Sequence, residues 1–498
     1  MKHQQCKEHK SGFRVLCTSL RVALLLLFLC GAGQAQYLTA RISVLSLSPA
    51  RVRVEGERLK ATTVWSFRNQ YGSLNGLGER SENLALRDDS GAQILVRKIA
   101  AGEFSAASPA TRFTYEVKLD PPAQTANAVY ASWLTNERGI LLPGDLLPVR
   151  SEKTEGASAA LRFVLPEAWS VAANETKQAD GQHQVVDAER AVFVVGPDLR
   201  RKHERIGLLE FSYVTSGRWA FTDEEVAGMA ASILKDHAEV MGGPARQSAM
   251  LVLIPFPRNV GAERWSAETR GGTVMLLSGQ NPSKTAALAH LSVPLTHELF
   301  HLWVPNGLAL DGNYDWFYEG FTSYQALRAG MRLNLLSFQD YLNALGRAFD
   351  AYMAIDGRDR LSLVEASQQR WQGQSGLVYH KALLVAFLYD LTLRQQTKNS
   401  RSLDDVYREL FRRHRSTAVE GNSAVIAMLK SQSGMQEFVS QYIEKPRAID
   451  LQAAVAPFGL EIPSGGVRTH PTVSASLSRS QRDLLRKFGY NENVQRRR

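Results

Sequence analysis

Two histidines separated by one helical turn are the residues of this sequence that most clearly could bind a metal. The run His297-Glu298-Leu299-Phe300-His301 places them at positions i and i+4, which share one face of a helix. Both imidazoles can therefore direct a nitrogen toward one zinc ion, at zinc–nitrogen distances of about 2.0–2.1 Å. Glu298 lies about 100° further round the helix, so its carboxylate is beside the metal, where it can hold a water molecule.

A stable zinc site needs a third protein ligand, and the next predicted helix supplies a carboxylate. Asp311-Gly312-Asn313 marks a turn, and the aromatic run 316–322 starts a helix after it. Glu319 lies within this apolar run, where burying its charge is unfavourable without a metal or another partner. His297, His301 and Glu319 make the two-nitrogen, one-oxygen set of catalytic zinc. We therefore expect one ion per chain, with a fourth position for water.

The alternative for the zinc helix is a pair of ordinary surface histidines, with Glu298 in a salt bridge. Both histidines are surrounded in sequence by the apolar residues Leu299, Phe300, Leu302 and Trp303. Such a setting is poor for imidazoles that have no ligand. The apolar neighbours therefore favour the metal site over the surface alternative.

Three segments resemble the gluzincin metallopeptidases, and more closely their glycyl-aminopeptidase branch. They are the run 297–303, the run 318–324, and the segment 379–384, which is similar to the family's Tyr-x-Lys-Gly sequence. Weaker similarities occur at 402–406 and 456–460. The resemblance covers most of 196–463. It implies a thermolysin-like catalytic domain, made of a small sheet plus a helical lobe, behind a β-sandwich.

The resemblance also implies roles for individual residues. The zinc ligands would be His297, His301 and Glu319. Glu298 would be the general base, and Tyr379 is similar to the family's tyrosine that donates a hydrogen bond to the tetrahedral intermediate. The alternative for Tyr379 is a core aromatic on the apolar helix from Leu377 to Leu391.

One feature of the family is missing from its expected position. Relatives carry a Gly-x-x-Glu strand before the zinc helix, and its glutamate binds the free amine of the substrate. Here the strand 271–275 has Val274 at that position, and Glu268 could replace it only if the strand is displaced. Aminopeptidase specificity is therefore doubtful, while the hydrolytic centre is unaffected. If the strand from Thr273 to Leu277 forms the edge of the cleft, it would align an extended peptide by adding it as another strand.

The elements that must position these residues divide the chain near residue 196. Up to that point polarity alternates along short runs separated by Pro and Gly, which predicts a β-sandwich domain over 36–195. The region 196–463 is mixed and then helical, so it is the predicted zinc metallopeptidase domain of an α+β chain. The tail, 464–498, is rich in Ser and Arg, lacks a sustained apolar period, and is expected to be mobile.

Local signals place several elements of the second domain. The runs 207–214 and 249–254 are typical of strands, and between them Thr222-Asp223-Glu224-Glu225 is a capping box. The box opens a helix that Gly242-Gly243 ends. Later helices are expected over 284–304, 315–330, 376–395, 402–413 and 435–443.

The N-terminal segment, 1–35, has the pattern of a secretory signal peptide. Residues 2–21 are basic, Val22 to Leu29 is continuously apolar, and Gly33-Gln34-Ala35 offers a cleavage site after Ala35. The apolar run is about half of the roughly 20 residues that span a membrane, so an anchor is disfavoured. All three cysteines, Cys6, Cys17 and Cys30, lie in this segment. We expect an exported protein, periplasmic or extracellular, with no disulfide and no stable membrane insertion.

The charge and composition exclude further classes. The formal net charge of +10 is concentrated at the ends, with +4 on 1–35 and +6 on 464–498. The body of the chain is near neutral, so nucleic acid is not an expected partner. A hydrophobic content of 44% in 498 residues excludes a disordered chain and predicts two or three domains.

Three functions remain open from the sequence. The first is a secreted zinc peptidase that hydrolyses a peptide or protein with a zinc-activated water and Glu298 as base. The second is a zinc hydrolase of a non-peptide substrate, since the same centre can activate water toward other electrophiles. The third is a catalytically silent binding protein with a structural metal. The presence of both Glu298 and Tyr379 argues against the third.

Overall fold

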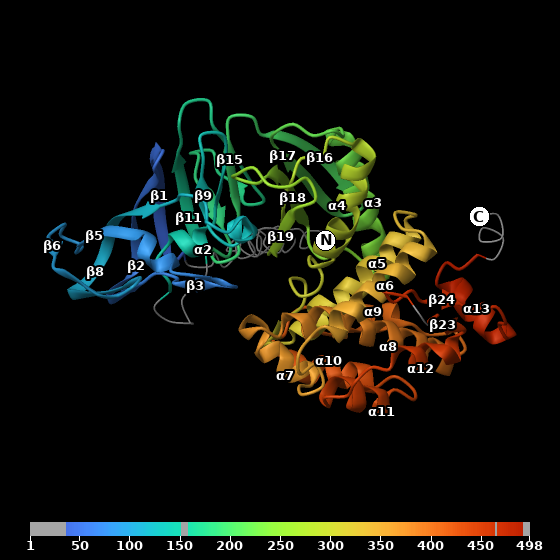
Figure 1. Ribbon diagram of the computed structural model, residues 1–498. Helices are drawn as coiled ribbons and strands as arrows, with labels where there is room; N and C mark the ends of the chain where they lie inside the picture. The colour runs from blue at the N-terminus through green and yellow to red at the C-terminus, as the bar shows by residue number, and fades with distance from the viewer. Residues whose placement is uncertain (1–35, 151–157, 464–465, 492–498) are drawn as a thin grey trace, which may run out of the picture.

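The computed structural model describes residues 36–150, 158–463 and 466–491. A β-rich N-terminal part is followed by a helical C-terminal part (Figure 1). The predicted α+β class is therefore confirmed, as a β-rich N-terminal part followed by a helical C-terminal part. The expected signal peptide lies outside the described residues. Among the described helices, none is both long and apolar enough to cross a membrane.

The N-terminal part is built on a nine-stranded sheet whose centre is three long strands. These are β1 (Leu38–Leu47), β2 (Ala50–Ser66) and β8 (Glu103–Lys118), and they alternate buried and exposed residues. The order is β13-β14-β11-β1-β2-β8-β5-β6, with β7 also paired to β8. The remaining strands of this sheet are β5 (Ser81–Arg87), β6 (Gln93–Ile94), β7 (Val96–Ala100), β11 (Ala159–Val164), β13 (Thr176–Lys177) and β14 (His183–Val185).

A smaller four-stranded sheet faces the first sheet. Its order is β12 (Ser170–Ala173), β15 (Phe193–Gly196), β10 (Gly139–Leu141) and β9 (Trp133–Leu134). Leu134, Leu141 and Phe193 from this sheet share a core with Val52 and Val54 of β2. Two further elements complete this part: the hairpin β3 (Gln70–Tyr71) to β4 (Leu74–Asn75), and the short helix α2 (Pro143–Leu146).

A five-stranded sheet begins the second part of the chain. Its order is β16 (Arg200–Ile206), β17 (Leu209–Thr215), β18 (Ser248–Pro255), β20 (Thr273–Ser278) and β19 (Trp265–Arg270). The inner strands β17, β18 and β20 are parallel, and β16 and β19 are antiparallel edges. Helix α3 (Asp223–Met241) begins with the predicted capping box, in which Thr222 accepts a hydrogen bond from the backbone of Glu225.

The two parts share a hydrophobic core near the predicted boundary. Ile140 and Val194 of the four-stranded sheet pack with Val252 and Ile254 of β18 and with Met275 of β20. The hydrophobic core therefore continues across the predicted domain boundary near residue 196. This shared core holds the two parts of the chain against each other around the site.

The strand from Thr273 to Leu277 does not form the edge of the cleft, because it is part of an inner strand, β20. Every residue of β20 is buried, because the strand lies between β18 and β19 and both of its faces are covered. The true edge is β19, which turns back into β20 through Gly271 and Gly272. Gly271 has φ of +53°, a conformation that favours glycine.

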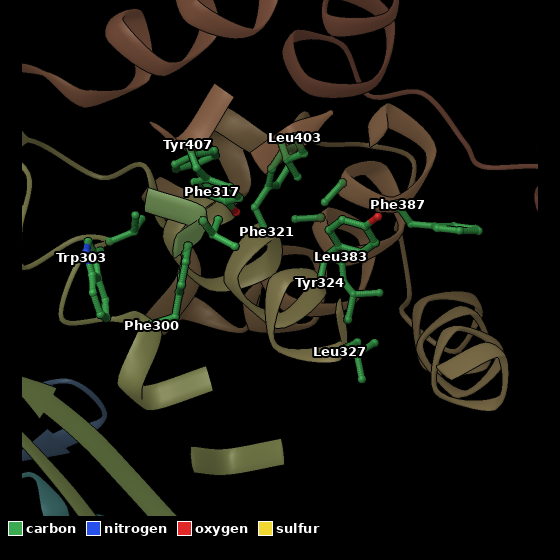
Figure 2. Packing of buried hydrophobic residues seen from close by; sticks show 14 of the residues in the cluster. Phe300, Trp303, Phe317, Phe321, Tyr324, Leu327, Leu383, Phe387, Leu403 and Tyr407 are labelled. Carbon is green, nitrogen blue, oxygen red and sulfur yellow. The ribbon is translucent and has the colours of Figure 1, made fainter. Parts of the chain in front are cut away.

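The helical lobe packs around an aromatic core. Figure 2 shows Phe300, Phe317, Phe321 and Tyr407 meeting in this core beside Leu403. The helices are α4 (Lys284–Phe300), α5 (Thr322–Arg332), α6 (Phe338–Met353), α7 (Leu363–Gln368), α8 (Ala382–Gln396), α9 (Leu403–Arg413), α10 (Gly421–Lys430), α11 (Gln436–Val439) and α12 (Leu451–Val455). Short strand pairs join the loops: β21 (Leu310–Asp311) with β22 (Val419–Glu420), and β23 (Leu460–Glu461) with β24 (Thr472–Val473).

The tail differs from the expectation of mobility over its described residues. Helix α13 (Arg479–Lys487) begins with a capping box from Ser478 to Gln481 and docks on the helical lobe. Leu484, Leu485 and Phe488 are buried there. Two apolar residues on one face of a nine-residue helix suffice for docking, although they are too few to create a sustained sequence period.

Candidate metal centre and active site

Helix α4 carries the two predicted histidine ligands at its C-terminal end. His297 and Glu298 lie in the last turn, and His301 is the C-cap residue. The Nε2 atoms of the two histidines are 3.0 Å apart. The spacing of one helical turn therefore brings both imidazoles to one point, as the sequence predicts.

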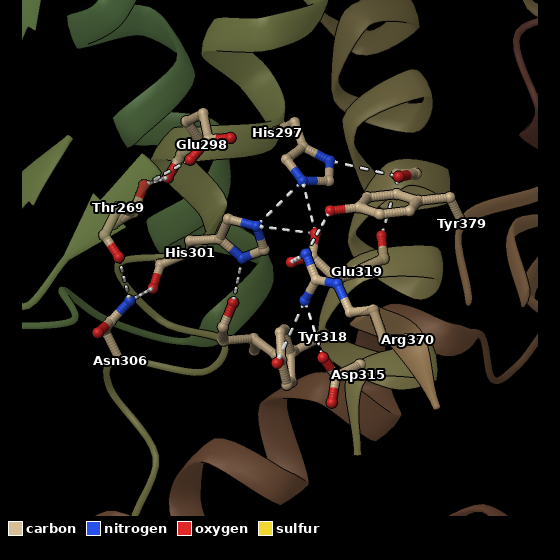
Figure 3. A network of polar contacts seen from close by, with 12 residues as sticks. Thr269, His297, Glu298, His301, Asn306, Asp315, Tyr318, Glu319, Arg370 and Tyr379 are labelled. Atoms are coloured by element: carbon tan, nitrogen blue, oxygen red, sulfur yellow. Dashed lines mark hydrogen bonds and ion pairs between the residues drawn. The ribbon is translucent and has the colours of Figure 1, made fainter. Parts of the chain in front are cut away.

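Glu319 meets the histidines from a neighbouring segment. Its Oε2 is 3.2 Å from His297 Nε2 and 3.5 Å from His301 Nε2 (Figure 3). Ligand atoms about 2.0–2.1 Å from one zinc ion in a tetrahedral arrangement would be about 3.3 Å apart. The three donor atoms fit such an ion.

Each histidine presents an unprotonated Nε2 when its other nitrogen donates. His301 Nδ1 is 2.7 Å from the carbonyl of Val304, which can only accept. Ser323 Oγ donates to the carbonyl of Glu319, so it accepts from His297 Nδ1 at 3.3 Å. Both imidazoles are thereby oriented as metal ligands by partners outside the centre.

Glu319 lies on a π-helical turn, Trp316–Phe321, that packs against a second π-helical turn, Leu377–Lys381. A Cβ on Gly320 would overlap Ala382 and the carbonyl of Val378, so glycine allows the close approach. Single π-helical turns are frequent at functional sites. Here they bring Glu319 and Tyr379 into one region.

The charges of the centre are strongly coupled. Burial alone would raise the pKa of Glu319, but Arg370, His301 and His297 hold it well below its ordinary value. Burial opposes the charged form of His301, yet Glu319 and Glu298 outweigh burial and raise its pKa to about 9. A metal ion that binds here must therefore displace a proton.

Glu298 lies beside the three donor atoms in a different environment. Its ligand oxygen is within 4.8 Å of the donor atoms of His297 and His301. Its Oε2 accepts a hydrogen bond of 2.7 Å from Thr269 Oγ1 on β19. Glu319 is within 3.5 Å of both histidines and Glu298 is held by Thr269, so we assign the third ligand position to Glu319.

Tyr379 lines the same cavity and contacts an arginine. Its Oη accepts a hydrogen bond of 2.7 Å from Arg370 Nη2. Arg370 also pairs with Glu319 Oε1 at 2.9 Å and with Asp315 Oδ1 at 2.8 Å. Arg370 therefore connects the predicted tyrosine to the ligand Glu319, because its guanidinium contacts both side chains.

The centre opens into a cavity of about 480 Å³ between the two parts of the chain. The hairpin β3 to β4 contributes Tyr71 and Gly72, and the helical lobe contributes Trp371. Gly72 has φ of +57° and faces the Trp371 ring, which a Cβ would touch at 3.4 Å. The N-terminal part thus forms one wall of the candidate active site.

Glu268 lines this cavity, whereas Val274 lies in the core. Glu268 Oε1 accepts a hydrogen bond of 2.7 Å from Tyr71 Oη. Val274 is fully buried on β20, paired with Thr269 of the edge strand. The sequence allows Glu268 this place only if the strand is displaced, and Glu268 does line the cavity, from the edge strand β19. Gly271 and Gly272 form the turn after the edge strand β19. Glu268 lies on that strand and therefore comes before the glycines in the sequence, not after them.

The comparisons with known proteins agree with this geometry. The model of the M61 glycyl aminopeptidase family matches residues 309–383, the stretch that contains Glu319, Arg370 and Tyr379. Over this stretch the chain resembles the glycyl aminopeptidases. The resemblance inferred from the sequence motifs is thereby confirmed. Among curated proteins, none matches the chain.

Solved structures share the fold over most of the chain. A crystal structure of an aminopeptidase N family protein from Idiomarina loihiensis aligns with a TM-score of 0.75 at 18% identity, covering 86% of this chain and 79% of that one. An M1 zinc metallopeptidase from Deinococcus radiodurans aligns with a TM-score of 0.55 at 14% identity, covering 84% and 95%. Together the comparisons and the ligand geometry support a zinc metallopeptidase.

The sequence did not identify Tyr71, Thr269 or Arg370 as residues of the site. It drew attention to Glu268 but gave this residue no definite role. Only Glu268 had a usable sequence signal. The run 265–268 alternates apolar and polar residues and 269–270 are polar, as suits an edge strand, while 273–278 is mostly apolar. Tyr71, Thr269 and Arg370 are ordinary polar residues until the fold places them.

Proposed function

We propose that this chain is a zinc-dependent aminopeptidase whose catalytic domain, 196–463, is thermolysin-like. One observation carries the proposal: two histidine nitrogens and a glutamate oxygen meet at distances that fit zinc, beside a second carboxylate held back by Thr269. A mutant of the Deinococcus metallopeptidase is bound to the substrate Tyr-Ser-Ala, which supports peptides as the substrate class.

The chain's own residues divide the chemistry of hydrolysis. Zinc held by His297, His301 and Glu319 would polarise a carbonyl and lower the pKa of a bound water to about 7. Glu298 takes the proton of the attacking water and later passes it to the leaving amine. Thr269 occupies Oε2 of Glu298 and leaves Oε1 for this exchange.

Tyr379 and Glu268 act on opposite ends of the first residue of the substrate, Tyr379 on its carbonyl and Glu268 on its free amine. Tyr379 donates its hydroxyl proton to the oxyanion that develops on the attacked carbonyl. Glu268 binds the free amine of the substrate, because it is a partly buried carboxylate that faces the cavity and accepts a hydrogen bond from Tyr71. A substrate amine bound there would place the first peptide bond near the centre, and this favours an aminopeptidase.

The test of the hydrolytic centre is Glu298→Gln. We expect the variant to keep one zinc per chain and to lose about 10²–10⁴-fold in kcat, because the base is lost and the ligands remain. Zinc content by atomic emission and kcat on a mixed peptide library check the two parts. Unchanged turnover in a zinc-loaded variant would refute the role of Glu298.

We also propose that the protein is exported. The support is the sequence pattern of residues 1–35, together with a remaining chain that contains no cysteine. N-terminal sequencing of protein recovered from the periplasm or the medium should begin after Ala35. Recovery of only the uncleaved chain in the cytoplasm would refute export.

A further inference from the structure

Arg370 connects parts of the site that the chain supplies from three different segments. It lies in a 3₁₀ turn, Arg370–Gln372, that follows α7. Its side chain is only 10% exposed and is surrounded by Asp315, Glu319 and Tyr379. Figure 3 shows the guanidinium between the ligand carboxylate and the tyrosine. The proposed function assigns no task to this arginine.

The terminal nitrogens of Arg370 each hold two partners. Nη2 donates a hydrogen bond to Tyr379 Oη at 2.7 Å and forms an ion pair with Glu319 Oε1 at 2.9 Å. Nη1 donates to Asp315 Oδ1 at 2.8 Å and to Tyr318 Oη at 3.4 Å. A planar fork can span these partners, whereas the single ammonium of lysine cannot.

The contact with Glu319 fixes which oxygen faces the histidines. Arg370 binds Oε1, and Oε2 remains within 3.5 Å of both Nε2 atoms. The positive charge also balances a buried carboxylate that must stay ionised to bind a metal. Arg370 therefore holds the ligand in one orientation.

The contact with Tyr379 fixes where its proton goes. Arginine has only donors, so Tyr379 Oη must accept from Arg370. The single hydroxyl hydrogen is then left for another acceptor. Among the described residues, Tyr379 Oη donates no hydrogen bond to a protein acceptor. The free direction is toward the cavity that Tyr379 lines.

We propose that Arg370 is a positioning residue, which orients the zinc ligand Glu319 and directs the hydroxyl proton of Tyr379 toward the substrate. The inference rests on the proposed function for the second of these two tasks. The first task, orienting Glu319, can be tested by metal binding alone. The two tasks therefore have separate readouts.

The first experiment measures zinc affinity of the whole protein by chelator competition. Arg370→Lys keeps the charge, so repulsion of the ion is unchanged while the fork is lost. We expect zinc to bind about 10-fold to 100-fold more weakly, as for other residues that support a metal ligand. Unchanged affinity would overturn the hold on Glu319, even if the enzyme had no peptidase activity.

A matched control is Arg394→Lys. Arg394 is equally buried and pairs with Asp390 at 3.1 Å in α8, away from the cavity. The substitution Arg394→Lys makes the same chemical change in another buried pair of an arginine and a carboxylate. We expect zinc affinity and kcat to stay at wild-type values. Equal losses in both lysine variants would mean that general destabilisation explains the result, and would overturn the proposal.

The second experiment measures kcat and KM at saturating zinc, in a cycle with Tyr379→Phe. Arg370→Lys should lower kcat by about 10-fold to 100-fold with little change in KM. In the Tyr379→Phe background the same substitution should have little further effect on kcat, because the proton that it directs is gone. The full loss in both backgrounds would overturn the role through Tyr379.

A second variant covers a failure of Arg370→Lys to fold. Asp315→Asn leaves Arg370 in place and weakens the hold on Nη1. It should change zinc affinity and kcat in the same directions, by smaller factors. Wild-type values for both would overturn the proposal. If the wild-type chain hydrolyses no peptide, the proposed function fails, and the zinc affinities still decide the orienting role.

Discussion

A buried carboxylate, Glu319, and a partly buried one, Glu268, face the same cavity, and their surroundings are opposite. Glu319 has an arginine and two histidines within 3.5 Å. Glu268 has one hydroxyl donor, Tyr71, and the more distant charge of Arg270. Burial raises the pKa of Glu268, and the nearby Glu298 and Glu319 raise it further. The pKa of Glu319 is instead held well below its ordinary value, despite burial.

The difference separates a permanent ligand from a transient one. A carboxylate with an arginine partner stays anionic and in place, as a metal site needs. A partly buried carboxylate with few partners is stabilised when a cation arrives, and the ammonium group of a peptide is such a cation. The same residue type in one cavity can therefore bind a resident ion at one end and a substrate at the other.

The strongest test of the contrast is Glu319→Gln. We expect purified protein to contain no stoichiometric zinc and kcat to fall by at least about 10²–10⁴-fold, because only two ligands remain. The variant should also unfold at lower temperature, since breaking a buried ion pair costs about 3–5 kcal/mol. Metal analysis, kinetics and calorimetry check these outcomes. Full zinc occupancy in this variant would show that Glu319 is not a ligand.

The matched substitution is Glu268→Gln, which should leave zinc occupancy intact. We expect kcat/KM for peptides with a free amine to fall about 10-fold to 100-fold, since a hydrogen bond to a charged group contributes about 1.5–3 kcal/mol. Peptides with a blocked amine should be affected little. Equal losses on both kinds of peptide would remove the assignment of amine binding.

The pH dependence sharpens the same test. Glu268 binds an ammonium group only when ionised, and burial raises its pKa above the ordinary value. For wild type, KM for a free-amine peptide should therefore fall as the pH rises through this pKa. In Glu268→Gln this dependence should be absent. A pH profile unchanged by the substitution would assign the titration to another group.

The metal centre was predictable from sequence because its geometry is local. His297 and His301 meet through helical spacing alone, and Glu319 stands out as a carboxylate in an aromatic run. The helix boundaries follow from capping residues such as Thr222, which the structure reproduces in α3. Local rules therefore predicted the zinc helix and its neighbour.

The substrate side of the site was not predictable by the same rules. The glycine pair Gly271-Gly272 matches the start of the family's Gly-x-x-Glu strand and so points to Val274, whereas Glu268 lies on the strand before it. Thr269 and Tyr71 gain their roles from contacts across 29 and 197 residues of sequence, and Arg370 contacts Asp315 across 55 residues. Such contacts depend on how strands and domains pack, and no spacing in the chain indicates them.

The smallest expected effect concerns the hydroxyl that connects the N-terminal part to the substrate site. Tyr71→Phe keeps the ring, which lies against Arg270 at 4.0 Å, and removes only the 2.7 Å hydrogen bond to Glu268. A single hydrogen bond contributes about 0.5–1.5 kcal/mol, so kcat/KM for free-amine peptides should fall about 2-fold to 10-fold.

The decisive comparison is made in the Glu268→Gln background, where Tyr71→Phe should have little further effect on free-amine peptides. The reason is that Tyr71 would act only by orienting the carboxylate of Glu268. An effect of the same size in both backgrounds would mean that the hairpin contacts the substrate directly. In that case the N-terminal part would itself bind the substrate. The small number of hydrogen-bond partners of the Glu268 carboxylate would then have another cause.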